Sequence, residues 1–171
     1  MIGGVMVAGF FILSVFTGNE RGELPYAKNI LAGASFAYGT AMIAYNYTSF
    51  DMMDLIRSKE LICFALLCIL NISAIDLWEH ANSTVDVEVK ASDELALTFP
   101  LTLLGAASIF FAAKDESFAT RPFFYAVLTG AALLQILNRS RNRFSINLLR
   151  VLADVALIAP ILVFFVSTKS N

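Results

Sequence analysis

Residues 61–80 read LICFALLCILNISAIDLWEH, an apolar run that ends in acids and a histidine. The run over residues 61–78 approaches the roughly 20 mostly apolar residues that a helix needs to cross a bilayer. Polar side chains are costly inside such a run, so Asn71 and Asp76 mark this segment as the first place to look for a function. The stretch predicts a membrane-spanning helix with a functional end.

The composition of the chain indicates a membrane protein. Hydrophobic residues make up 58% of the 171 residues and charged residues only 15%, against about 45–50% and about 25% in an average soluble domain. The formal net charge of -2 gives no indication of a nucleic-acid partner. The two cysteines, Cys63 and Cys68, share one apolar run and are interpreted as packed or lipid-facing residues, not as a disulfide or metal pair.

The hydropathy pattern predicts an all-α fold, a polytopic membrane helix bundle of about six transmembrane helices in one domain over residues 1–171. The six apolar runs cover residues 2–16, 30–47, 61–78, 95–113, 122–137 and 148–166. Pro100 and Pro160 lie inside the fourth and sixth runs, where each is expected to kink its helix and free a carbonyl.

The distribution of Lys and Arg predicts the orientation. The loops after spans one, three and five, with the adjoining helix ends, hold seven of these residues, and the other side holds five. The positive-inside rule therefore places the loops after spans one, three and five in the cytosol. In this orientation several polar residues gather at the cytosolic surface, namely Asp76, Glu79, His80, Gln135, Asn138, Arg150 and Asp154.

The acidic end of the third span predicts a cation site. Asp76, Glu79 and His80 are spaced i, i+3 and i+4, so they share one helix face. Carboxylates are disfavoured at a helix C-terminus, and magnesium would suit them because it takes one or two carboxylates, waters and phosphate oxygens. The alternative is a polar cap wetted by water and headgroups. Zinc is not expected, because no second His or Cys lies at ligand spacing.

Arginines near the fifth and sixth spans have two interpretations. Arg150 precedes Asp154 by four residues, which predicts an ion pair on one helix face. Alternatively, Arg150, Arg139 or Arg141 binds an anionic headgroup or a diphosphate, as basic pockets at cytosolic helix ends do.

The third span and the loop after it resemble the second aspartate-rich region of UbiA-type membrane prenyltransferases. Asp76 takes the position of the helix-end aspartate, and the loop residues 86–92, DVEVKAS, take that of the acidic loop before the next helix. The resemblance implies prenyl transfer and a prenyl diphosphate held with Mg²⁺ at the cytosolic face. We therefore expect metal ligands at Asp76, Glu79, Asp86 and Glu88, and substrate-binding residues at Asn71, Arg139, Arg141 and Arg150.

The sequence also departs from that family. No equivalent of the first aspartate-rich region occurs in the chain, the acidic loop is shorter, and Glu79-His80 replaces a small or tyrosyl residue. One hypothesis is therefore a diverged relative that binds an isoprenoid diphosphate and needs a partner membrane subunit for the missing half. The alternative is a non-catalytic subunit that packs against other subunits or membrane lipid. A transporter is less favoured, because the charged groups lie at the interface and not at the midplane. Enzymatic activity stays open.

Overall fold

A computed structural model of the protein describes residues 24–45 and 52–169, and within them all regular structure is helical, with no strand. Two compact units divide the chain, the first ending at Ile72 and the second beginning at Ser73. The boundary between them falls inside the helix α4 (Lys59–Ser83), so each unit contains part of that helix.

The first unit contains α2 (Leu24–Tyr45), α3 (Met52–Arg57) and the N-terminal part of α4. Gly33 of α2 lies against the backbone of α4, because a Cβ added at Gly33 would be 2.6 Å from the Cα of Ile69. Such close approach of two helices is typical of small residues in membrane proteins. Cys63 and Cys68 are both free and buried, as expected for packed residues.

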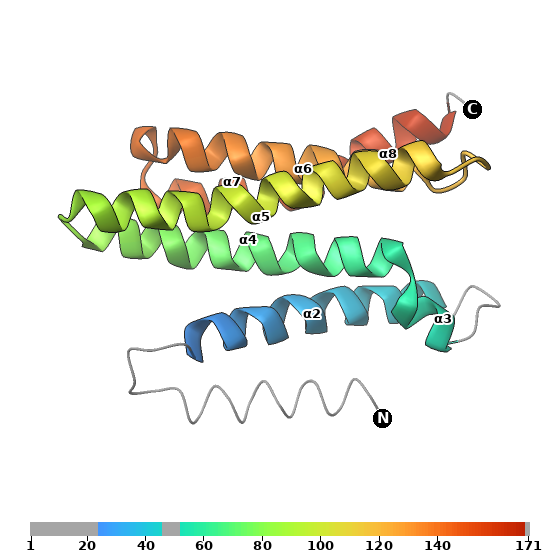
Figure 1. Ribbon diagram of the computed structural model, residues 1–171, viewed down its shortest axis with the longest axis horizontal. Helices are drawn as coiled ribbons and strands as arrows, with labels where there is room; N and C mark the ends of the chain where they lie inside the picture. Colours follow the sequence, from blue (N-terminus) through green and yellow to red (C-terminus); the bar gives the residue numbers. More distant parts are fainter. Residues whose placement is uncertain (1–23, 46–51, 170–171) are drawn as a thin grey trace. The chain divides into compact units, whose positions relative to one another are not determined.

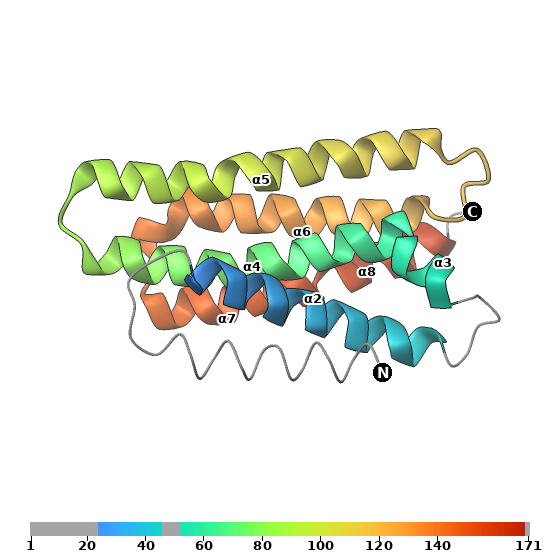
Figure 2. The same cartoon turned by 60° about the horizontal axis from the view of Figure 1, so that its bottom comes forward.

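The second unit is built around α6 (Arg121–Ser140). This helix packs against α5 (Val87–Lys114), α7 (Ile146–Ile158) and α8 (Pro160–Lys169), as both ribbon views show (Figures 1 and 2). The core of the unit consists of buried apolar residues of α5, α6 and α7. They include Leu97, Leu101, Leu104, Phe124, Val127, Leu134, Leu149 and Ala153. A short helix, η1 (Arg141–Arg143), follows α6.

Local sequence explains where the helices of the second unit begin and break. Asp86 caps α5 by accepting a hydrogen bond from the Glu88 N–H at 2.9 Å, and Ser145 caps α7 through the Leu148 N–H. Proline has no N–H to donate, and α7 ends at Ile158 while α8 begins at Pro160. A kink was expected at both prolines: α7 gives way to α8 at Pro160, whereas Pro100 lies inside the continuous helix α5.

Three helices of the described residues are long and apolar enough to cross a membrane: Lys59–Ser83, Val87–Lys114 and Ile146–Thr168, the last formed by α7 and α8 together. They coincide with the predicted third, fourth and sixth spans. Helix α6 covers the predicted fifth span and α2 covers residues 30–45 of the predicted second, but neither is one of these three. Helix α6 carries polar Gln135, Asn138 and Arg139 near its end. The predicted first span, residues 2–16, lies outside the described residues.

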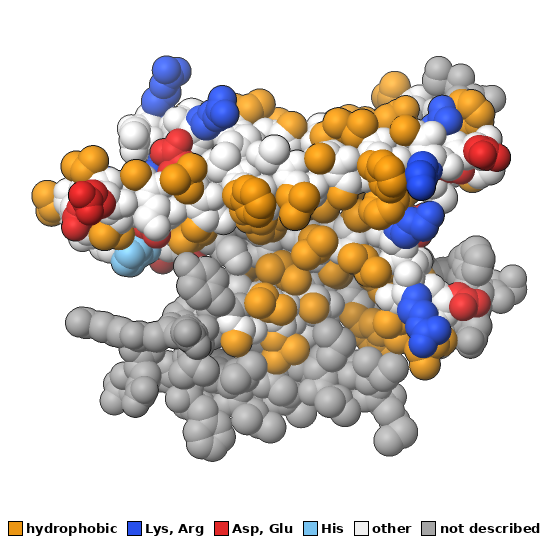
Figure 3. Space-filling view, viewed as in Figure 1, with side chains coloured by type: hydrophobic (Ala, Val, Ile, Leu, Met, Phe, Trp, Pro, Cys, Tyr) orange, Lys and Arg blue, Asp and Glu red, His pale blue; other side chains and the backbone are white. Residues whose placement is uncertain are grey.

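Charged side chains of the second unit gather at the two ends of its helices, and hydrophobic side chains lie between them on the face shown in Figure 3. Many of the large hydrophobic side chains are exposed, including Phe99 at 72% and Leu103 at 61%. An apolar band between two charged ends is the pattern of a protein that meets hydrocarbon in the middle and headgroups at both ends.

Candidate functional site

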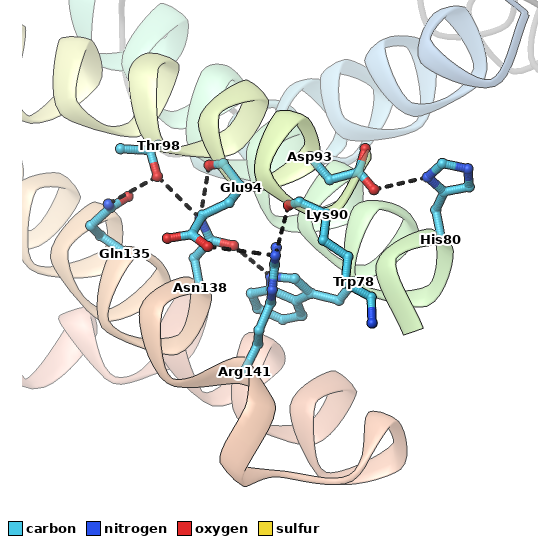
Figure 4. A network of polar contacts seen from close by, with 9 residues as sticks. All are labelled: Trp78, His80, Lys90, Asp93, Glu94, Thr98, Gln135, Asn138 and Arg141. Atoms are coloured by element: carbon cyan, nitrogen blue, oxygen red, sulfur yellow. Dashed lines mark hydrogen bonds and ion pairs between the residues drawn. The ribbon is translucent and has the colours of Figure 1, made fainter. Parts of the chain in front are cut away.

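One end of the second unit brings together residues far apart in the sequence. The C-terminal end of α4, the N-terminal end of α5 and the C-terminal end of α6 meet there (Figures 1 and 4). The Trp78 indole N–H donates to the Asn138 Oδ1 at 2.9 Å and thereby joins α4 to α6. Both residues are buried: 2% of the surface of Trp78 and 1% of that of Asn138 is exposed.

Asn138 is the centre of this polar cluster. Its Nδ2 donates to the Glu94 carbonyl oxygen at 3.1 Å and to the Thr98 Oγ1 at 3.2 Å, and Gln135 Nε2 also donates to Thr98 Oγ1 (Figure 4). The Asn138 amide therefore uses both its donor and acceptor atoms. Buried polar groups that are satisfied in this way fix a single arrangement of helices, so the cluster holds α4, α5 and α6 in register.

Arg141 follows Asn138 by one helical turn and extends to α5. Its Nη2 donates to the Lys90 carbonyl oxygen at 2.8 Å and lies 3.5 Å from the Glu94 Oε2. The residue is only 8% exposed, yet its Nη1 has no hydrogen-bond partner among residues 24–45 and 52–169. A buried charged donor without a partner is costly, so this atom is the unusual feature of the site.

A cavity of about 180 Å³ opens beside Arg141. Its lining includes two residues with cationic side chains and two with amide side chains, namely Arg141, Lys90, Asn82 and Asn142. Trp78, Phe144 and Ile146 are among the residues of the apolar wall. A cavity of about 150 Å³ holds a benzene molecule, so this one has room for a small anionic group. Guanidinium and ammonium groups beside amides form a suitable set of donors for phosphate or carboxylate oxygens.

The four predicted metal ligands have different surroundings. Glu79 Oε1 accepts from Arg150 Nε at 2.9 Å and Nη2 at 2.7 Å, while Asp86 caps α5 and Glu88 and Asp76 are exposed. Within the described part of the chain, no three His, Cys, Asp or Glu residues are placed to hold a metal ion together. The i, i+3 spacing identified a shared helix face, but Glu79 reaches an arginine of α7 from that face.

His80 has a partner that the sequence did not reveal. Its Nδ1 lies 2.8 Å from the Asp93 Oδ2, which ties the end of α4 to the first turns of α5 (Figure 4). The imidazole is 60% exposed and the carboxylate 12% exposed. The contact gives the histidine a structural role across the α4–α5 turn, and no sequence spacing signals it because the two residues are 13 positions apart.

The predicted substrate-binding residues have different environments. Arg141 lines the cavity, Arg139 is exposed, and Arg150 pairs with Glu79 rather than with Asp154. Asn71 belongs to the first unit, where it is 4% exposed and its Oδ1 has no hydrogen-bond partner among the described residues.

Sequence reasoning missed Lys90, Asn82 and Asn142 as residues of the cavity and Glu94 as a neighbour of Arg141. Polar residues near helix ends are common, and only the three-dimensional arrangement distinguishes these. Comparisons of the chain with models of protein families, with characterised proteins and with solved structures found no match.

Proposed function

We propose that this chain is an integral membrane protein whose second unit binds the phosphate group of an amphiphilic ligand in the cavity beside Arg141. The proposal retains the six-span arrangement and assigns the cavity to the cytosolic side by the positive-inside rule. Support comes from the helices long and apolar enough to cross a membrane and from the polar cluster at one end of the second unit.

The observation that carries the proposal is the Arg141 Nη1. It is buried and charged and has no hydrogen-bond partner among the described residues, and Arg141 lines a cavity that Lys90 also lines. An anion in the cavity would lie beside the guanidinium and offset the cost of its buried charge. The apolar wall that includes Phe144 and Ile146 offers contact to the hydrocarbon part of the ligand.

An isoprenoid diphosphate is the ligand class that we favour. The resemblance of the Asp76 region to prenyltransferases motivates it, and the Arg141 side chain fits a diphosphate because the planar guanidinium pairs with phosphate oxygens. Whether prenyl transfer follows binding depends on groups outside the cavity, so binding is the function proposed for this site.

Ligand-induced stabilisation tests the proposal. The full chain in detergent micelles is heated with inorganic pyrophosphate or geranylgeranyl diphosphate, and the unfolding temperature is compared with that of Arg141→Gln. A ligand that binds only the folded state at 100 times its Kd stabilises it by about 2.7 kcal/mol. The parent and Arg143→Gln, an exposed neighbour on η1, should show the shift. Absence of a shift in the parent with both ligands would reject the proposal.

Magnesium is proposed as a second part of the same binding event and has its own test. We expect geranylgeranyl diphosphate to bind more tightly with Mg²⁺ than with a chelator, because the ion binds phosphate oxygens and neutralises their charge. Asp86→Ser keeps a capping oxygen on α5, and combined with Glu88→Gln it removes two carboxylates. If the Mg²⁺-dependent gain survives this pair of substitutions, these acids are not its ligands.

A non-catalytic subunit of a larger membrane complex is the second candidate. It is favoured by the row of exposed large side chains on α5, which includes Leu95, Phe99, Leu103 and Phe110. Phe99→Cys in native membranes distinguishes the two surroundings: rapid cross-linking to another polypeptide supports a subunit interface, whereas reaction only with lipid-soluble thiol reagents supports contact with lipid.

A further inference from the structure

The charge of Arg141 has one nearby carboxylate, and that carboxylate is poorly engaged. The Glu94 Oε2 is 3.5 Å from the Arg141 Nη2, longer than the 2.7–2.9 Å of a strong charged hydrogen bond. The Glu94 side chain is 45% exposed, whereas the arginine side chain is 8% exposed. The same Nη2 makes its short contact with the Lys90 carbonyl oxygen at 2.8 Å. Glu94 is therefore the more weakly held partner of this arginine.

The main chain of Glu94 is held independently of its side chain. Its carbonyl oxygen accepts from the Asn138 Nδ2 at 3.1 Å, as part of the cluster that fixes α5 against α6 (Figure 4). The carboxylate can therefore rotate away from Arg141 without disturbing that cluster. Outward rotation moves it toward solvent, where a charged group is better hydrated.

We propose that Glu94 is the resting counter-ion of Arg141 and that the phosphate group of the ligand displaces it. This inference rests on the proposed function, since it concerns the arginine that lines the cavity. Glu94 contacts that arginine and is not itself one of the lining residues. The ligand must overcome the Arg141–Glu94 attraction and the repulsion between Glu94 and its own negative charge. Glu94 therefore lowers the affinity of the site for anions and stabilises the free protein.

The strength of this effect follows from the exposure of Glu94. A unit charge near the ligand would change the affinity strongly at an effective dielectric constant near 20, but the exposed carboxylate is screened by water and salt. We expect Glu94→Gln to tighten pyrophosphate binding by about three- to tenfold. Without ligand, the same variant should unfold at a lower temperature than the parent, because Arg141 loses its counter-ion.

The experiment is isothermal titration of pyrophosphate into the full chain and its Glu94→Gln variant, together with thermal unfolding of both without ligand. Glu116→Gln, an exposed acid in the α5–α6 loop, is the matched control and should change neither quantity. In the Arg141→Gln background, Glu94→Gln should give no tightening, because the arginine that couples them is gone.

The outcomes separate this inference from the proposed function. Tighter binding with lower stability of the free protein supports the displacement of Glu94. Unchanged or weaker binding by Glu94→Gln, with the parent binding normally, would overturn the role of Glu94 and leave the anion site intact. Failure of both the parent and Glu94→Gln to bind pyrophosphate and geranylgeranyl diphosphate would overturn both.

Discussion

Trp78 and Asn138 are 60 residues apart in the sequence, and the indole N–H of the first donates to the amide oxygen of the second at 2.9 Å. Both residues are buried at the end of the second unit that holds the cavity. Trp78 itself lines the cavity, and Asn138 precedes Arg141 by one turn. This single contact thus links the helix packing to the position of the guanidinium.

Substitution of Asn138 should destabilise the protein. Asn138→Leu leaves the Trp78 N–H buried without an acceptor, so the free energy of unfolding should fall by about 1–3 kcal/mol. Asn147→Ala, an exposed asparagine of α7, should change it by less than about 0.5 kcal/mol. Denaturant unfolding in mixed micelles measures both. The Trp78→Phe/Asn138→Leu double variant tests whether the two residues are coupled. If its unfolding free energy falls by the sum of the decreases in the two single variants, they are not.

Arg141 is predicted to contribute nothing to the stability of the ligand-free protein and to be necessary for anion binding. Arg141→Met replaces an incompletely paired buried charge by an apolar chain of similar length, which removes the cost of keeping that charge out of water. The unfolding free energy of the ligand-free variant should therefore equal or exceed that of the parent, despite loss of the hydrogen bond to the Lys90 carbonyl. A loss above about 2 kcal/mol would identify Arg141 as a structural residue instead.

Two glycines of α2 make a matched pair in the first unit. A Cβ at Gly33 would lie 2.6 Å from the Ile69 Cα, whereas nothing lies within 4 Å of a Cβ at Gly39. Gly33→Ala should therefore force the two helices apart and destabilise the unit, by about 1–3 kcal/mol for overpacking. Gly39→Ala should be neutral or stabilising by up to about 1 kcal/mol. Equal effects of the two substitutions on the unfolding free energy would contradict the close approach.

The loop after α5 predicts a dependence of stability on pH. Asp115 accepts hydrogen bonds from the Ser117 hydroxyl at 2.6 Å and the Thr120 N–H at 2.7 Å, and these bonds hold the pKa of its carboxyl well below the usual range. Because the folded-state pKa is depressed, the carboxylate stabilises the fold above its unfolded-state pKa of about 3.9. That contribution is lost as the pH falls through the folded-state pKa.

Asp115→Asn should remove this dependence. The variant should be less stable than the parent at pH 6, and the difference should shrink as unfolding is measured at successive pH values below about 4. Glu116→Gln, an exposed neighbour in the same loop, should keep the difference between neutral and acidic pH that the parent shows. An Asp115→Asn profile parallel to that of the parent down to the lowest pH would show that the hydrogen bonds do not shift this group.

The helical fold and the membrane character could be predicted from the sequence because they depend on length and hydropathy, which are local properties. The runs at 61–78, 95–113 and 148–166 each lie within a helix or helix pair long enough to span a bilayer. The break at Pro160 was also predictable, since a proline lacks the donor that a continuous helix needs. The number of spans also depends on α2 and α6, which are not among the three helices long and apolar enough to cross a membrane. Hydropathy alone does not decide whether such helices span the bilayer.

The contents of the site could not be predicted to the same depth. Helix spacing placed Glu79 and His80 on one face, but it could not show that Arg150 and Asp93 would reach them from other helices. Those partners are 71 and 13 residues away. Arg141 was singled out from its basic loop, yet its burial depends on how α6 meets α5, as does the lack of a partner for its Nη1 within the described part of the chain. Such contacts follow from tertiary packing and not from sequence periodicity.

The most direct test of the anion site is isothermal titration of inorganic pyrophosphate into the full chain, compared with Arg141→Lys and Arg141→Gln. We predict binding of one pyrophosphate per chain, weaker binding by Arg141→Lys because the second guanidinium nitrogen is lost, and at least about tenfold weaker binding by Arg141→Gln. Equal affinity of the parent and Arg141→Gln for pyrophosphate would contradict the account.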